Sequence, residues 1–256
     1  MRDLGKRGQL AIFVIIALVI VVGIVLFFFF RGNVTNVFAG AFSPNAFLKD
    51  CATKGINPDL ERLAKQGGYS NPEAFKLFNG EKHTYLCYTS ENFKTCVVQQ
   101  PMIKAHFEQE LNSIVKSKAD QCMRDLIEEY KKRGYGASVT GVNSKTSFVP
   151  GNVLVSFNNS LTVTKEASET FPGFEVKVES NMYDLIFIAQ SIVDYESKFG
   201  NSATELYMQY YPNLKIEKIK LSDGTTIYKL SNVITKEEFD FASRSLAWGA
   251  GYGTDK

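Results

Sequence analysis

The sequence is poor in the residues and motifs on which most enzymes and metal proteins depend. It has two histidines and one tryptophan in 256 residues. Neither His83 nor His106 belongs to a recognisable metal-binding motif. No GxSxG, HExxH or P-loop motif occurs. We therefore expect no catalytic residue, no metal and no cofactor, and a hydrolase built from distant carboxylates is the least favoured alternative.

Cysteine is also scarce, and its spacing excludes further classes of protein. The chain has four cysteines and no CxxC motif, which excludes zinc-ribbon and thioredoxin-like sites. An even number of cysteines is typical of proteins in oxidising compartments, and four cysteines allow three disulfide pairings. We favour Cys87–Cys96, across a turn at residues 90–92, and by elimination Cys51–Cys122.

The chain lacks an excess of charge of either sign, with 29 basic and 27 acidic residues. Within residues 1–31, one acidic residue accompanies four basic ones, which are Arg2, Lys6, Arg7 and Arg31. The rest of the chain therefore has 25 basic against 26 acidic residues. Its longest basic run, residues 131–133, closes a predicted helix, where cations complement the helix dipole. The sequence thus indicates no nucleic-acid partner.

One long hydrophobic run dominates the N-terminus. Leu10–Phe30 comprises 21 residues without a polar side chain, enough for a membrane-spanning helix. The basic residues on its N-terminal side place residues 1–9 in the cytoplasm, as a basic flank or leader. We expect a single-pass cell-membrane protein with a tether at 31–43 and an extracytoplasmic domain at 44–248. A secretory signal cleaved near residues 39–41 is the alternative.

Helical patterns occupy much of the predicted domain. The longest helix is expected from Pro101 to about Arg133, and Lys118 interrupts its apolar stripe. Its apolar residues recur every three or four positions, and they are Ile103, Phe107, Leu111, Ile114, Cys122, Leu126 and Tyr130. An earlier helix begins at Ser43-Pro44, restarts at Asn57-Pro58 and ends at Gly67.

Two further helices are expected in the C-terminal half, at residues 182–199 and 203–211. In the first of them we expect an inward face, formed by Leu185, Ile186, Ala189, Ile192 and Val193. Residues 236–248 form a last helix or extended segment, and residues 249–256 a flexible tail.

Strand patterns occur between these helices. Residues 83–89 and 93–99 are predicted to pair, as are 153–157 and 161–163 around an Asn158-Asn159 turn. Residues 174–179 alternate as a half-buried strand, and residues 214–221 and 225–230 form a hairpin. The fold class is therefore α+β, with a long amphipathic helix and antiparallel hairpins.

Two kinds of surface feature are candidates for function. Tyr207, Tyr210 and Tyr211 form an aromatic cluster, which indicates either a recognition surface or packing over a sheet. Asn33 and Asn158 begin N-glycosylation sequons.

The N-terminal motif carries a resemblance to a known family. Lys6-Arg7-Gly8-Gln9 is followed directly by the apolar run. This motif resembles the class III signal of archaeal type IV pilin-like proteins, in which a peptidase cuts after the glycine. The resemblance implies cleavage between Gly8 and Gln9 and a retained helix that self-assembles in a filament. The chain departs from many such pilins at Phe13, where they have glutamate.

The rest of the chain is similar to a group of uncharacterised archaeal single-pass surface proteins. The similar features are Cys51 in a helix, the Gln66-Gly67-Gly68-Tyr69 loop, Cys122 in a long helix, the strands around Asn158 and the closing Phe239-Asp240-Phe241-Ala242. The group implies a cell-surface location and no activity.

These observations favour a non-enzymatic, membrane-anchored extracytoplasmic protein that acts as a binding or envelope component. Its partners are the membrane, through Leu10–Phe30, and an unknown protein or envelope component. The alternative is a pilin-like filament subunit processed between Gly8 and Gln9.

Overall fold

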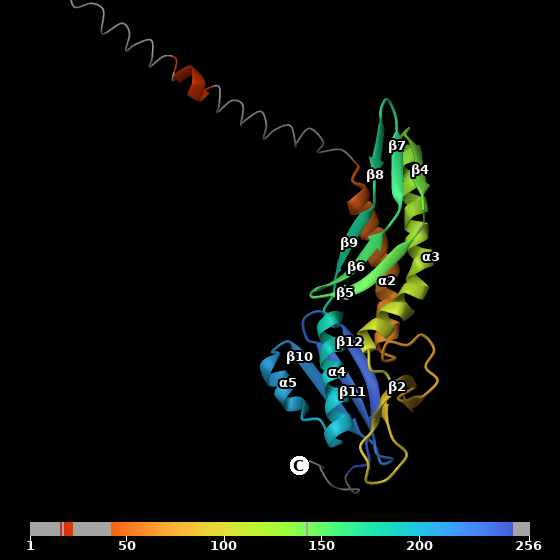
Figure 1. Ribbon diagram of the computed structural model, residues 1–256, viewed down its shortest axis with the longest axis vertical. Coiled ribbons are helices and arrows are strands. Elements are labelled where there is room, and N and C mark those ends of the chain that lie inside the picture. The colour runs from red at the N-terminus through yellow and green to blue at the C-terminus, as the bar shows by residue number, and fades with distance from the viewer. Residues whose placement is uncertain (1–15, 17, 23–41, 142, 248–256) are drawn as a thin grey trace, which may run out of the picture. The chain divides into compact units, whose positions relative to one another are not determined.

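The computed structural model describes residues 16, 18–22, 42–141 and 143–247 of an α+β protein (Figure 1). The chain divides into two units, residues 1–43 and 44–256. Most of the predicted membrane segment, Leu10–Phe30, lies outside the described residues, although residues 16 and 18–22 are helical. Of the helices that are described, none is both long and apolar enough to cross a membrane.

Several other predictions concern residues that the structure does not describe. These are the Gly8–Gln9 processing site, the Asn33 sequon, nearly all of the 31–43 tether and the 249–256 tail. The second sequon is described, and Asn158 is exposed between two strands.

Two helices lie side by side in the second unit (Figure 1). α2 (Pro44–Ala64) is one continuous helix with Pro58 inside it, so the predicted restart at Asn57-Pro58 is wrong. A proline can continue a helix where its missing N–H is tolerated, and sequence does not reveal that context. α3 (Ile103–Lys132) follows the prediction closely, although Val115 and not Ile114 is the buried residue at that turn.

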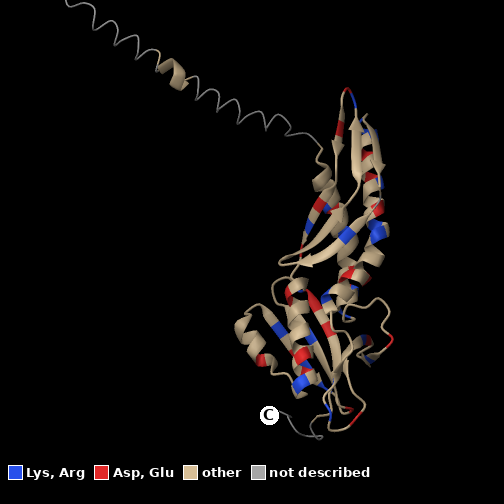
Figure 2. Cartoon of the chain, viewed as in Figure 1, with Lys and Arg blue, Asp and Glu red and all other residues tan. Residues whose placement is uncertain are grey.

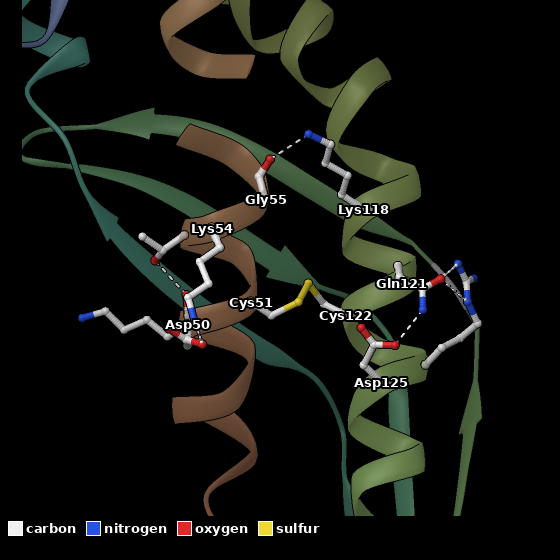
Figure 3. Close-up of a disulfide and its surroundings, with 11 residues drawn as sticks. Asp50, Cys51, Lys54, Gly55, Lys118, Gln121, Cys122 and Asp125 are labelled. Atoms are coloured by element: carbon white, nitrogen blue, oxygen red, sulfur yellow. Dashed lines mark hydrogen bonds and ion pairs between the residues drawn. A yellow bond between two sulfur atoms is a disulfide. The ribbon is translucent and has the colours of Figure 1, made fainter. Parts of the chain in front are cut away.

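A disulfide and a lysine join α2 to α3 (Figure 3). Cys51 and Cys122 are bonded, with 5.8 Å between their Cα atoms. Lys118, which interrupts the apolar stripe, donates from Nζ to the Gly55 carbonyl at 2.9 Å. It also forms an ion pair with Asp59. Lys118, the polar residue within the apolar stripe of α3, thus contacts α2.

Two three-stranded sheets accompany these helices. One has the order β4 (Gly136–Thr140), β7 (Ser160–Thr164), β8 (Ser168–Phe171). The other has the order β5 (Ser144–Val149), β6 (Asn152–Phe157), β9 (Phe174–Glu179). All of their strand pairs are antiparallel.

The predicted hairpin around Asn158-Asn159 is wrong, because β6 and β7 belong to different sheets. Phe157 pairs with Ser144 and Phe174, whereas Leu161 pairs with Val139 and Phe171. Alternation shows which face of a strand is buried, but it does not identify the neighbouring strand. The sequence therefore predicted the strands and not their partners.

The largest sheet has the order β1 (Phe75–Phe78), β2 (Glu81–Tyr88), β12 (Glu238–Arg244), β11 (Thr225–Asn232), β10 (Leu214–Lys220). A two-residue strand, β3 (Val97–Val98), also pairs with β2. The segment predicted as helix or extended is thus a strand, β12, which runs parallel to β2. The β10–β11 hairpin forms as predicted.

The second disulfide joins Cys87 to Cys96, with 5.3 Å between their Cα atoms. The pairing of the cysteines is the expected one, but the strand that follows Cys96 is shorter than predicted. Cys87 lies opposite Val98 in the sheet, and Cys96 precedes the short strand β3. Residues 83–89 and 93–99 thus pair as predicted, but only through Cys87–Val98 and Tyr88–Val97, so most of the predicted second strand is absent. A turn assigned from sequence fixes the register of a hairpin only when its length is known.

α4 (Met182–Phe199) and α5 (Thr204–Tyr210) lie over one face of the largest sheet (Figure 1). α4 contacts β11, β12 and β2, and α5 contacts β10. The inward face of α4 is the predicted one, since Leu185, Ile186, Ala189, Ile192 and Val193 are all buried. Figure 2 shows acidic and basic residues interspersed along these elements, in agreement with a net charge near neutrality.

Candidate functional site: the aromatic surface of α4 and α5

The outer face of α4 carries a row of aromatic side chains. Tyr183 and Phe187 are four residues apart, as are Tyr195 and Phe199, so the two members of each pair are neighbours on successive turns of the helix. The rings of Tyr183 and Phe187 have centroids 4.6 Å apart, and those of Tyr195 and Phe199 are also 4.6 Å apart. Phe187, Tyr195 and Phe199 are exposed. We call these four residues the α4 ridge.

A serine occupies the gap in the middle of the ridge. Ser191 lies between the two aromatic pairs, and its Oγ is 2.8 Å from the Tyr207 hydroxyl of α5. This hydrogen bond joins the ridge to the tyrosines of the second helix.

The three tyrosines predicted as a recognition surface lie in one groove. Tyr207, Tyr210 and Tyr211 line a hollow of about 520 Å³ together with four other residues, which are Tyr195, Ser202, Ala203 and Leu206. Tyr210 is 79% exposed and Tyr211 is 52% exposed. Of the two interpretations, packing over the sheet therefore does not describe Tyr210 or Tyr211. We call this hollow the tyrosine groove.

Buried polar groups hold the start of α5 against α4. The Glu196 carboxylate, on the inner side of α4, accepts a hydrogen bond from the Ser202 N–H at 2.8 Å. It also accepts hydrogen bonds from the Tyr228 hydroxyl and, at 3.3 Å, from the Ser243 hydroxyl. Burial, together with the Glu196 charge, raises the pKa of Tyr228, so Tyr228 stays a protonated donor. These hydrogen bonds hold the connection between α4 and α5 against the sheet.

The other end of α5 is held by β10. The Ile216 N–H of β10 points to the Met208 sulfur at 3.3 Å. Proline follows at 212, where the helix cannot continue. The groove therefore has a rigid frame, while Tyr210 and Tyr211 face solvent.

This surface offers mainly apolar and aromatic contact area. Its lining is aromatic and aliphatic with a few hydroxyl groups, and aromatic side chains of this kind provide large contact area at low entropic cost. A smaller hollow beside it, of about 150 Å³, adds one carboxylate, that of Asp184. Neither hollow is lined by a histidine, cysteine or lysine.

His83 and His106, the two histidines considered from sequence, and the carboxylate of Glu108 lie elsewhere. His83 is fully buried in β2, and the ring of His106 in α3 packs at a tilt against that of Tyr69, with centroids 4.0 Å apart. Burial lowers the pKa of both histidines. Glu108 forms an ion pair with Lys104. No group of three or more histidine, cysteine or acidic residues that could hold a metal ion is found in the described part of the chain.

Sequence reasoning missed the α4 ridge. A signal was present, because two aromatic pairs occur at a spacing of four residues and none of their members belongs to the predicted inward face. The groove itself could not be inferred, since it depends on how α5 is placed against α4.

Comparison of the chain with protein-family models, curated proteins and solved structures found no match.

Proposed function

We propose that this chain is a membrane-anchored extracytoplasmic protein that binds a protein partner through the tyrosine groove and the α4 ridge. The observation that carries the proposal is the contiguous exposure of aromatic side chains on α4 and α5. Exposed aromatic clusters rimmed by polar residues are typical of protein interaction sites. Tyrosine is also among the residues most enriched at binding hot spots.

Two observations support the location. Leu10–Phe30 has the length and composition of a membrane helix, and the basic residues before it favour a cytoplasmic N-terminus. All four cysteines are disulfide-bonded, and disulfides persist outside the cytoplasm. An exposed Asn158 within a sequon is compatible with glycosylation in the same compartment.

Photocrosslinking in intact cells tests the binding surface. A benzoylphenylalanine residue at position 210 of the full chain should yield a discrete protein adduct, because Tyr210 is the most exposed tyrosine of the groove. The same residue at Lys177, which is exposed on β9, is the matched control. Substitution of Tyr207 and Tyr211 by serine should reduce the adduct at 210 roughly tenfold or more. An adduct equally strong from position 177, or unchanged by the serines, would contradict the proposal.

A pilin-like subunit is the second candidate, and the Lys6-Arg7-Gly8-Gln9 motif before the apolar run favours it. Mass spectrometry of the native N-terminus distinguishes the two. A mature chain that begins at Gln9 supports the filament subunit, whereas an intact Met1 or Arg2 supports the unprocessed anchor.

A further inference from the structure

Two smaller hollows adjoin the tyrosine groove toward the start of α4. The hollow of about 150 Å³ shares Tyr207 and Tyr211 with the groove, and Asp184 and Ile188 of α4 are also in its lining. We call it the Asp184 hollow. A third hollow, of about 160 Å³, shares Asp184, Ile188 and Tyr211 with the Asp184 hollow. Because neighbouring hollows have lining residues in common, the three form one trough along α4 and α5.

This trough has a single charge in its lining. Among the residues that the structure describes, Asp184 is the one charged residue that lines any of the three hollows. Asp184 is exposed, and its carboxylate forms no ion pair or hydrogen bond with another described residue. The faces of aromatic rings carry partial negative charge and attract cations. An unpaired carboxylate beside two tyrosine rings therefore favours a cationic ligand.

A buried hydroxyl in the tyrosine groove also lacks a partner. Ser202 is 1% exposed and lines the groove, and its Oγ has no hydrogen-bond partner within the described part of the chain. Buried polar groups in proteins are nearly always hydrogen-bonded. A main-chain carbonyl or N–H group of a bound peptide would satisfy this hydroxyl. The groove thus suits a polypeptide segment better than a purely apolar ligand.

We propose that the protein partner inserts an arginine side chain into the Asp184 hollow, where its guanidinium group pairs with Asp184 and packs against the rings of Tyr207 and Tyr211. This inference rests on the proposed function, because it names the side chain by which the partner is recognised. Arginine fits better than lysine, since a guanidinium group is planar, stacks on aromatic rings and donates two parallel hydrogen bonds to one carboxylate. An exposed ion pair alone contributes little to affinity, so the tyrosine rings are an essential part of the site.

Saturation-transfer NMR with two small probes tests the site in the full chain in lipid nanodiscs. N-acetyl-arginine methylamide is the probe, and N-acetyl-citrulline methylamide, which has nearly the same shape without the charge, is its matched control. We expect saturation transfer to the arginine probe to exceed that to the citrulline probe about threefold or more. Equal transfer to the two probes, or no transfer to the arginine probe at millimolar concentration, would overturn the proposal.

Substitutions of Asp184 test the ion pair. Asp184→Asn should raise the dissociation constant of the arginine probe about threefold or more, whereas Asp184→Glu, which keeps the charge, should retain most of the binding. Asp194→Asn is the matched control, because Asp194 is an exposed carboxylate of the same helix that lines none of the three hollows. Asp194→Asn should leave the dissociation constant unchanged.

Thermal unfolding distinguishes binding from a structural role of Asp184. An acidic residue in the first turn of a helix interacts favourably with the helix dipole, so Asp184→Asn should lower the unfolding temperature slightly. A role confined to the helix would change that temperature and leave the dissociation constant of the arginine probe as it was. That result would refute the proposal.

The crosslink from position 210 in intact cells separates this inference from the proposed function. Asp184→Asn should reduce the protein adduct at 210, and Asp194→Asn should not. An adduct that Asp184→Asn leaves unchanged would overturn the arginine contact while the partner surface stands. Absence of any adduct, even from the chain with Asp184 intact, would contradict the proposed function and with it this inference.

Discussion

Gly68 lies against the side chain of Phe107 at the loop that follows α2. Its φ is 87°, and a Cβ atom at this position would lie 3.1 Å from the Cβ of Phe107. Gly68→Ala therefore adds a steric overlap to the cost of a left-handed alanine. We expect it to lower the free energy of unfolding by about 2–4 kcal/mol in denaturant titrations of the full chain.

Gly80 is the matched control for this substitution. Its φ is 83°, and a Cβ atom there would meet nothing within 4 Å. Gly80→Ala should therefore cost only the left-handed backbone term, about 1–2 kcal/mol. Equal losses from the two alanines would show that the loop moves away from Phe107 freely.

Asp240 makes stability depend on pH. It is 1% exposed on β12, and burial raises its pKa to about 7, although Lys229 is 3.6 Å away and opposes the shift. The neighbouring Glu238 and Glu81 raise this pKa further. Because the folded state holds this proton more tightly than the unfolded state, the free energy of unfolding should fall as pH rises from about 4 to 7.

Asp240→Asn should remove this contribution. Because burial lowers the pKa values of the two histidines, their contribution to the free energy of unfolding increases with pH. Both chains contain these histidines, so this contribution cancels in the comparison. We expect the free energy of unfolding of the variant to rise relative to that of the unsubstituted chain as pH rises from 5 to 7. A difference that stays constant over that interval would contradict the assignment.

At the scale of elements, the helices and the β10–β11 hairpin could be predicted from sequence, whereas the partners of the other strands mostly could not. The beginning and end of α4 and α5 depend on local chemistry, such as Gly200 in the left-handed conformation and Pro212. The partners of β6 and β7 depend on segments as far away as β4 and β9. β1, β4, β5 and β8 were missed because they are short or rich in Ser, Thr, Lys and Gly.

The two disulfides should differ in what they contribute to stability. Cys51 and Cys122 are 71 residues apart, whereas Cys87 and Cys96 are 9 apart. By the loop-entropy relation, the first stabilises by about 4 kcal/mol and the second by about 2.5 kcal/mol. The double variant Cys51→Ser/Cys122→Ser should therefore unfold at lower denaturant concentration than Cys87→Ser/Cys96→Ser. The reverse order would show that another factor outweighs loop length.

At the scale of the whole molecule, the candidate site was predictable in part. Tyr207, Tyr210 and Tyr211 are close in sequence, so their clustering was visible there. The groove also requires Tyr195 from another helix, placed by the Ser191–Tyr207 hydrogen bond and by the buried Glu196 beneath Ser202. Contacts between elements of this kind have no pattern in a single sequence.

The central proposal is that the described domain lies outside the membrane to which residues 10–30 anchor it. Lys132, Lys177 and Lys236 are exposed on three parts of this domain. A membrane-impermeant amine-reactive label, applied to intact cells and read by peptide mass spectrometry, reports their location directly. We predict that all three lysines are labelled in intact cells while a cytoplasmic marker protein is not. Labelling of these lysines only after the cells are lysed would contradict the proposal.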